Sequence, residues 1–370
     1  MDQELNNIDF QELRDKAYML RYELFDDLEK HLLKIEEALQ KNGVKVSWAQ
    51  DEQSLYGEIA ACLPQSSYNT ATLDLDNFND LPLGDNILNT YPLEDIINHH
   101  QNVDTLIVNA DYAISSTGEM VFIDRKSQHC FNKISNLVVV LNIDQIVASH
   151  EELDVFLYLR QCVNQNNVPK DLKFLSKSFD RVVQDDFQTS NSKGYSTEQV
   201  NVSVILYENN ITPILRNNRL RDALFCIKCG KCMDVCPVAK VAGGVSPIEL
   251  VKSTCLNPAS HSQDIFQKTT LCGNCKEACP IGINFTDLLI YVMNMINEKT
   301  NNTKSKKLLS IIHKRGKLNK YNSPILRWYL VKKMFGKNRV LFDYFKHQKD
   351  TFFNLANKDN TEPSDESFEL

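Results

Sequence analysis

The sequence predicts an α/β domain followed by a smaller, cysteine-rich helical domain. Two observations carry this prediction. Through residues 11–165, apolar residues recur at helical spacing and then in short β-branched runs, as in layered α/β architectures. After residue 225 the pattern changes to two groups of closely spaced cysteines, with helical segments between and after them. The chain of 370 residues is long enough for such a division into domains.

The N-terminal half opens with predicted helices around a short strand. Residues 11–42 are predicted to form a helix, because apolar side chains recur three or four positions apart and Gly43 supplies a stop. Residues 44–46 look like a short strand. Residues 51–62 resume the helical spacing, and Asp51 is a suitable N-cap.

Two apolar runs predict the interior of a sheet. Residues 105–108 read as a buried strand, and residues 137–141 form a continuous β-branched and leucine run that suits a central strand covered on both faces. Residues 151–160 are predicted to form the helix that follows, with Ser149 as its N-cap.

The segment before the cysteines is predicted to contain a loop and a hairpin. Residues 166–200 are polar and irregular, which is typical of a long surface loop. Residues 202–207 form a predicted strand, residues 209–210 a turn with positive φ, and residues 211–215 the returning strand. Residues 220–225 are predicted to lead as a helix into the first cysteine.

The first cysteine group reads Cys226-Ile-Lys-Cys229-Gly-Lys-Cys232-Met-Asp-Val-Cys236-Pro237, which matches C-x2-C-x2-C-x3-C-P at every position. This run binds a [4Fe–4S] cluster with three cysteines and gives its fourth to a neighbouring cluster. A zinc site usually has two pairs of ligands, and a disulfide framework is typical of short secreted chains. The spacing therefore predicts iron–sulfur chemistry.

The second group reads Cys272-Gly-Asn-Cys275-Lys-Glu-Ala-Cys279-Pro280, and it lacks the first cysteine of the run. Alignment of the two groups puts Thr269 in that position. With the fourth cysteines exchanged, the first cluster has four predicted ligands: Cys226, Cys229, Cys232 and Cys279. The second cluster has three: Cys236, Cys272 and Cys275.

Three explanations of the missing ligand remain open. The second centre could be a [3Fe–4S] cluster. It could be a [4Fe–4S] cluster with an exchangeable ligand such as water, Thr269 or a group from a partner. Alternatively, Cys255 could supply the fourth thiolate from the spacer, in a segment that looks like a loop. Helices predicted at residues 246–251 and 285–296 favour an α-helical ferredoxin-type module over the compact bacterial ferredoxin.

Composition and charge narrow the protein's class. The net charge of −7 does not favour nucleic-acid binding. The acidic N-terminus lacks the features of a secretory signal, and no apolar run is long enough to span a bilayer, so a cytoplasmic protein without a transmembrane segment is expected.

Residues 298–349 are basic with interleaved aromatics, which predicts a helical hairpin docking on an acidic partner; peripheral contact with anionic lipid is an alternative. An acidic, disordered tail is expected from residue 361.

Several stretches resemble the lactate utilisation protein B family. They are residues 207–232 and 271–280, including the absent cysteine at position 269, and more weakly residues 109–118 and 38–43. The resemblance implies a LUD domain, an α/β domain related to CoA-transferase and sugar-isomerase folds, in a system that oxidises L-lactate to pyruvate. It also implies two partners, a cysteine-rich iron–sulfur protein and a second LUD-domain protein. The expected domains are residues 1–215 (LUD-like), 216–297 (iron–sulfur) and 298–370 (extension and tail).

Electron transfer is the leading functional hypothesis: two clusters relay electrons from a substrate oxidised at the LUD domain or on a partner. The alternative is a regulatory LUD domain with the clusters as redox sensors. No G-x-G-x-x-G run is present, which disfavours a dinucleotide held in that way. The sequence does not identify catalytic residues. Asp111, Thr117 and Glu119 are the polar candidates, with internally satisfied loop residues as the competing interpretation.

Overall fold

The computed structural model of the protein describes residues 10–63, 70–73, 90–92, 105–123, 134–163, 173–175, 200–242, 245–256 and 268–300. The chain divides into two compact units, residues 1–212 and residues 213–370, and each is described by itself. The predicted basic extension and acidic tail after residue 300 lie outside the described residues. Most of the predicted loop 166–200 does too, but residues 173–175 within it form a strand rather than loop.

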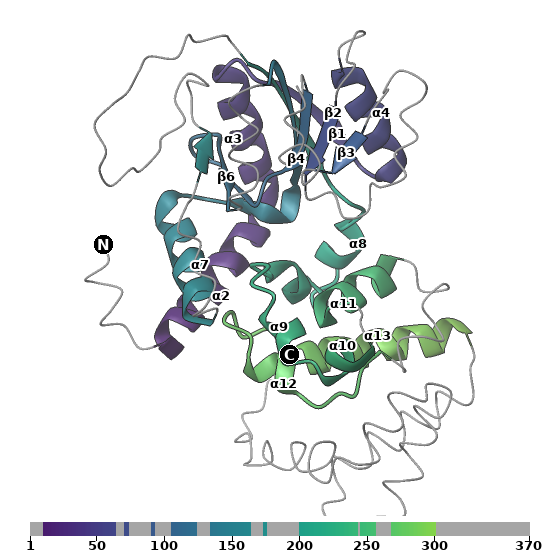
Figure 1. Ribbon diagram of the computed structural model, residues 1–370. Coiled ribbons are helices and arrows are strands. Elements are labelled where there is room, and N and C mark those ends of the chain that lie inside the picture. Colours follow the sequence, from purple (N-terminus) through teal and green to yellow (C-terminus); the bar gives the residue numbers. More distant parts are fainter. Residues whose placement is uncertain are drawn as a thin grey trace, which may run out of the picture. The chain divides into compact units, whose positions relative to one another are not determined.

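The first unit is built on a six-stranded parallel sheet (Figure 1). Its strands, in spatial order, are β1 (Lys45–Ala49), β10 (Asn201–Tyr207), β7 (Asn136–Asn142), β4 (Thr105–Asn109), β2 (Thr70–Leu73) and β3 (Thr90–Pro92). β7 lies inside the sheet between β10 and β4, and its five central residues are buried. The prediction of a central strand at 137–141 is therefore confirmed.

The predicted N-terminal helix is two helices, α2 (Phe10–Asp26) and α3 (Leu28–Lys41), because the backbone leaves helical geometry at Asp27. The break allows the two halves to pack on different elements: α2 packs on α7 (His150–Val163), whereas α3 packs on β1. Apolar periodicity continues across the break, so the sequence pattern did not reveal it.

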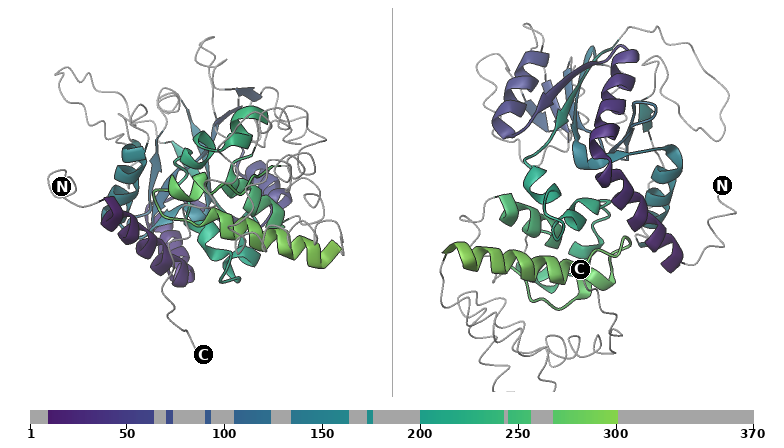
Figure 2. Two further views of the ribbon diagram at one scale, coloured as in Figure 1. Left: turned by 90° about the horizontal axis from the view of Figure 1, so that it is seen from below. Right: turned by 180° about the vertical axis from the view of Figure 1, so that it is seen from behind.

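Helix α4 (Glu52–Cys62) begins as predicted at Asp51. The Asp51 carboxylate accepts a hydrogen bond from the backbone N–H of Ser54 at 2.8 Å, and the Ser54 hydroxyl accepts one from the N–H of Asp51 at 3.0 Å. This reciprocal capping satisfies two of the N–H groups that a helix start leaves without partners. These hydrogen bonds also hold the pKa of Asp51 below its usual value. Helices α3 and α4 lie on opposite sides of the sheet (Figures 1 and 2).

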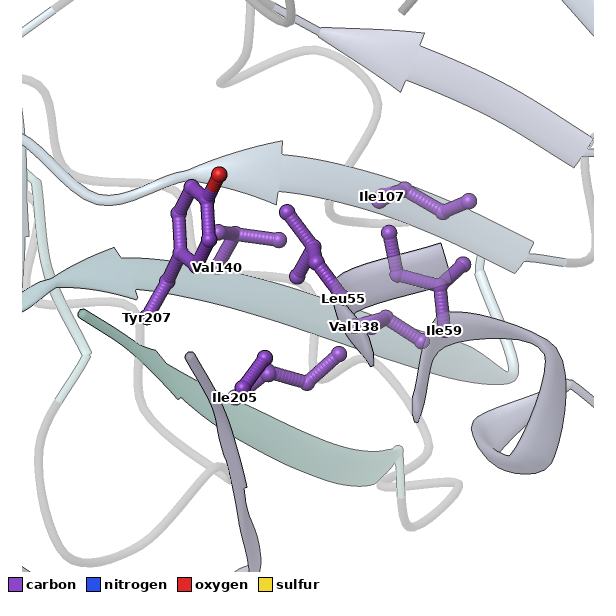
Figure 3. Close-up of a cluster of buried hydrophobic side chains, with 8 residues drawn as sticks. Leu55, Ile59, Ile107, Val138, Val140, Ile205 and Tyr207 are labelled. Carbon is purple, nitrogen blue, oxygen red and sulfur yellow. The ribbon is translucent and has the colours of Figure 1, made fainter. Parts of the chain in front are cut away.

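A cluster of buried side chains joins α4 to one face of the sheet (Figure 3). Leu55 and Ile59 come from α4 and are fully buried. They pack on side chains that alternate along three strands: Ile107, Val138, Val140, Ile205 and Tyr207. Burial of this apolar surface is what fixes the helix on the sheet.

Ile59→Val is expected to lower the free energy of unfolding by about 1 kcal/mol, because it removes one buried methylene group from this cluster. Chemical denaturation of the whole chain, followed by circular dichroism, measures the difference. Gln53→Ala on the exposed side of the same helix is the matched control and should change stability by less than about 0.5 kcal/mol. Equal effects of the two substitutions would contradict the packing described here.

A smaller four-stranded sheet completes the first unit. Its order is β8 (Ile146–Val147), β5 (Tyr112–Ile114), β6 (Glu119–Phe122) and β9 (Lys173–Leu175). A short 3-10 turn, Ile143–Gln145, connects β7 to β8, and α7 follows. The predicted N-cap of α7 is confirmed, since the Ser149 hydroxyl accepts a hydrogen bond from the N–H of Glu152 at 3.4 Å.

The predicted turn after β10 is confirmed, but the predicted returning strand is wrong. Asn209 and Asn210 both have φ of 53°, as the turn prediction required. The chain then forms a short helix, α8 (Thr212–Leu215), instead of a returning strand. Pro213 explains the difference, because proline has no N–H for a strand ladder and suits the first turn of a helix. β10 instead pairs in parallel with β1 and β7.

The described part of the second unit is helical. It contains a 3-10 turn (Arg221–Phe225) where an α-helix was predicted, then α9 (Lys231–Asp234), α10 (Pro237–Ala242), α11 (Pro247–Leu256), α12 (Asn274–Glu277) and α13 (Phe285–Thr300). α11 is the helix predicted from residue 246, and it begins with a cap in which Ser246 and Glu249 form reciprocal hydrogen bonds. α11 and α13 pack on each other. Within the described residues, no helix combines the length and the apolar character needed to cross a bilayer.

Candidate metal centre

The first cysteine loop is shaped by two left-handed residues. Lys228 has φ of 53° and Gly230 has φ of 75°, and the one-turn helix α9 begins directly after Gly230. At position 230, glycine takes this left-handed conformation without the steric cost that a side chain would bring. The turn brings the N–H of Lys228 to 3.4 Å from the Cys226 sulfur, to which it donates a hydrogen bond. Cys226, Cys229 and Cys232 therefore lie on one tight turn of backbone.

The second loop repeats this geometry residue by residue. Leu271 has φ of 53° and Gly273 has φ of 84°, and the one-turn helix α12 follows. The first turn of each short helix is closed by an N–H···O bond of 2.9 Å, from Met233 to Gly230 and from Lys276 to Gly273. α9 and α12 also contact each other. The two loops therefore have equivalent backbones and lie together.

Burial and neighbouring sulfurs raise the pKa of the Cys232 thiol well above its usual range. The neighbouring sulfurs that act on it are Cys226, Cys229, Cys275 and Cys279. Three of these belong to the predicted ligand set of the first cluster, and Cys279 comes from the second loop. Such a group of buried thiols becomes a group of thiolates only with a cation among them, because buried like charges oppose ionisation.

A second group of sulfurs forms around Cys275. Burial, together with the neighbouring sulfurs of Cys272 and Cys236, raises the pKa of this thiol to about 12. Cys236 belongs to the first loop, so each loop brings its last cysteine beside the other loop's thiols. The pKa of Cys279 is also raised by burial, but the backbone N–H groups of Ile281 and Ile283 hydrogen-bond its sulfur and lower it. Such N–H···S bonds are known to tune iron–sulfur sites.

A small pocket lies against this second group. Its lining includes the three cysteines predicted for the second cluster, Cys236, Cys272 and Cys275. Lys268, Thr269 and Thr270 also line it, together with apolar residues of α11 and α13. Soft thiolate donors in a largely apolar enclosure fit an iron–sulfur cluster. Among the described residues, no three His, Cys, Asp or Glu side chains converge closely enough for a single metal ion.

The structure brings Thr269, but not Cys255, to this pocket. Cys255 lies in the last turn of α11 rather than in the predicted loop, and it does not line the pocket. The reciprocal cap at Ser246 starts this helix, and Pro258 disfavours helical geometry in the residue before it. Between these two signals, the chain is helical from Pro247 to Leu256.

The three polar candidates of the first unit bond within the domain. The Asp111 carboxylate accepts the N–H of Ile123 at 2.8 Å. The Thr117 hydroxyl donates to Glu119 at 3.0 Å, and Glu119 also pairs with His150 at 2.6 Å. This geometry favours the interpretation as satisfied loop residues.

Sequence reasoning missed two buried charged residues, one on α2 and one on α7. Arg21 is fully buried and donates to the carbonyl of Ile146 at 3.0 Å, with its guanidinium 4.7 Å from the centre of the Phe156 ring. Glu152 is also buried, and it accepts the N–H of Ala148 at 2.5 Å. The available signal was a charged residue within the apolar stripe of α2, between Ala17 and Leu24.

Two family models match successive parts of the chain. A family model described as the LUD domain matches residues 32–205. A second, described as a 4Fe-4S dicluster domain, matches residues 222–283 and spans both cysteine loops. The chain carries a LUD domain followed by a 4Fe–4S dicluster domain. An α/β domain followed by an iron–sulfur domain was the fold predicted from the sequence.

Curated proteins similar to this chain include lactate utilization protein B of Bacillus cytotoxicus, which is 28% identical over 204 residues. That match covers 52% of this chain and 40% of the relative. The protein of the same name from Macrococcus caseolyticus is 29% identical over 171 residues, 44% of this chain and 33% of the relative. The matches thus cover less than half of the relatives' length. The predicted resemblance to this family is confirmed. A solved DUF162 family protein from Deinococcus radiodurans is 16% identical and covers 49% of this chain and 98% of its own, with a TM-score of 0.36.

Proposed function

We propose that the dicluster domain holds two iron–sulfur clusters and that the protein transfers electrons between them. The ligands of the first cluster are Cys226, Cys229, Cys232 and Cys279, and those of the second include Cys236, Cys272 and Cys275. The observation that carries the proposal is the exchange of the last cysteine between two equivalent loops, which brings the two groups of sulfurs together. When bound, such clusters accept and donate single electrons.

The role of this chain's own residues is to hold and tune the two centres. Gly230 and Gly273 set the loop turns, and the N–H groups near Cys226 and Cys279 place partial positive charge beside the sulfurs. Hydrogen bonds and burial of this kind adjust the potential of an iron–sulfur centre. The contact between α9 and α12, and the effect of the Cys275 sulfur on Cys232, support a short path for electrons between the two proposed centres.

Similarity to proteins named lactate utilization protein B supports a finer proposal. In it, the protein is a subunit of a cytoplasmic multi-protein system that oxidises L-lactate to pyruvate, with a cysteine-rich iron–sulfur protein and a second LUD-domain protein as partners. The proposed domains remain residues 1–215, 216–297 and 298–370. The α-helical ferredoxin type of the second domain, and the relation of the first to CoA-transferase and sugar-isomerase folds, belong to the same proposal.

Anaerobic iron and sulfide analysis, with an EPR-monitored redox titration, tests the core of this proposal. We expect about seven or eight irons per chain, and two paramagnetic centres that cycle reversibly. No more than about four irons per reconstituted chain, the content of a single [4Fe–4S] cluster, or centres that do not reduce in any accessible range, would refute electron transfer through two clusters.

The purified chain alone is expected not to oxidise L-lactate with an artificial dye as electron acceptor, because iron–sulfur clusters carry single electrons and lactate oxidation releases two. The measurement is dye reduction under anaerobic conditions with the reconstituted protein. Lactate-dependent dye reduction should appear when the two proposed partner proteins are added. Sustained turnover by the chain alone would contradict its role as an electron-transfer subunit.

One observation favours a second candidate, a redox sensor. Thr269 lines the pocket beside the three cysteines proposed for the second cluster, and an incompletely ligated cluster can change on oxidation. Reversibility separates the two functions: a relay keeps its iron through repeated cycles at fixed potentials, whereas a sensor converts or sheds its second cluster within the physiological range.

A further inference from the structure

The residue at position 269 is the structural counterpart of Cys226 in the second cysteine loop. In the first loop, the N–H of Lys228 donates to the sulfur of Cys226 at 3.4 Å. In the second loop, the N–H of Leu271 donates to the hydroxyl oxygen of Thr269 at 3.2 Å. The two donors share φ of 53°. Thr269 therefore reproduces the local hydrogen bond of Cys226, with oxygen in place of sulfur.

Thr269 is also positioned toward the second group of sulfurs. It is 8% exposed, and it lines the same pocket as Cys236, Cys272 and Cys275. A hydroxyl is a neutral, hard donor, whereas iron in sulfur clusters takes soft thiolate ligands. Thr269 thus fills the position of the fourth ligand without supplying a thiolate.

The rival ligand is placed elsewhere. Cys255 is fixed in the last turn of α11, and the lining of the pocket does not include it. This turn is held in place by its neighbours, since Val251 and Thr254 on the same helix are buried. The folded backbone therefore favours position 269 over position 255.

We propose that Thr269 makes one iron of the second cluster labile, so that this iron carries an exchangeable oxygen-donor ligand, such as water, instead of a fourth protein thiolate. The proposal rests on the two-cluster function argued above. It assigns a role to a side chain: cysteine at position 269 would close the site, and threonine keeps it open.

Mild oxidation of the reconstituted full chain with ferricyanide tests this proposal. One electron passes from the cluster to ferricyanide, and the oxidised core then releases one Fe²⁺, which converts a [4Fe–4S] core into [3Fe–4S]. We expect the wild type to lose about one iron per chain and to gain the EPR signal of an oxidised [3Fe–4S] centre. Thr269→Cys should retain its iron and give no such signal.

Three variants make the comparison specific. Thr269→Ser keeps the hydroxyl and should lose iron like the wild type. Thr270→Cys places a thiol one residue away, at a site 4% exposed, and should not protect the iron. Cys255→Ser should change nothing. An oxidation-resistant wild type, equal iron loss in Thr269→Cys, or loss of an iron in Cys255→Ser under conditions where the wild type keeps it would each overturn the proposal.

A second measurement covers failure of Thr269→Cys to fold. Addition of isotopically labelled Fe²⁺ and a reductant to the oxidised wild type should restore about one iron, and Mössbauer spectroscopy should find the label in a single site. Label spread over all irons of the second cluster would contradict a labile corner. Failure of the two-cluster function itself is distinguishable, because the wild type would then assemble no more than about four irons at the outset.

Discussion

Cys279→Ser is expected to remove the first iron–sulfur cluster, about four irons per chain, although Cys279 lies in the second cysteine group. The physical reason is the exchange between the loops: Cys279 acts electrostatically on Cys226 and Cys232, whereas Cys272 and Cys236 act on Cys275. Anaerobic iron analysis gives the loss, and EPR of the remaining centre shows which cluster survives.

The reciprocal substitution is the control for this exchange. Cys236→Ser, in the first group, should remove the second cluster and leave the first. Cys62→Ser, a half-buried thiol packed at the edge of the sheet core, should leave both in place. If each group instead held its own cluster, Cys279→Ser would alter the second centre and Cys236→Ser the first, and the assignment proposed here would be wrong.

The cysteine spacing could predict the loops because their geometry is local. Runs of x2 between cysteines, with glycine after the second one, specify the turn that both loops adopt. Spacing also predicted the absent ligand at Thr269. It could not place Cys255, because the end of α11 depends on a cap nine residues earlier and on a proline that follows.

Tertiary packing explains where the prediction of the first unit failed. The break at Asp27 is invisible in a stripe of apolar residues that continues through both helices, and it reflects what α2 and α3 each contact. The returning strand after Asn210 was predicted from the turn alone, with too little weight given to Pro213. The central strand and the capped helices were predictable, since periodicity and capping residues specify them locally.

The buried pair of Arg21 and Glu152 could not be predicted in this way, because its members are far apart in sequence. Burial is the dominant influence on Glu152. It raises the pKa of this carboxyl to about 7, although the positive charge of Arg21 acts to lower it. In the described part of the chain, Glu152 Oε1 and the Nε and Nη2 atoms of Arg21 have no hydrogen-bond partner. The pair therefore leaves the cost of burying charge only partly offset.

Glu152→Gln is expected to change how the stability of the protein depends on pH. The folded state holds the Glu152 proton up to about pH 7, whereas the unfolded carboxyl ionises near 4.5. Because the folded state binds more protons between these values, the wild type loses stability as pH rises through this window, and glutamine cannot ionise. From pH 5 to pH 8, the wild type should therefore lose about 2–3 kcal/mol relative to the variant.

Denaturant unfolding of the two proteins at several pH values measures this difference, and taking the difference cancels the contributions of the other titrating groups. Glu151→Gln is the matched control, because Glu151 is the exposed neighbour on α7 and its pKa is lowered by a hydrogen bond from Ser149. The free energy of unfolding of Glu151→Gln should follow the pH dependence of the wild type, and should not approach that of Glu152→Gln at alkaline pH. Parallel curves for the wild type and Glu152→Gln would show that the carboxyl ionises at its ordinary pKa, and that Arg21 compensates for its burial.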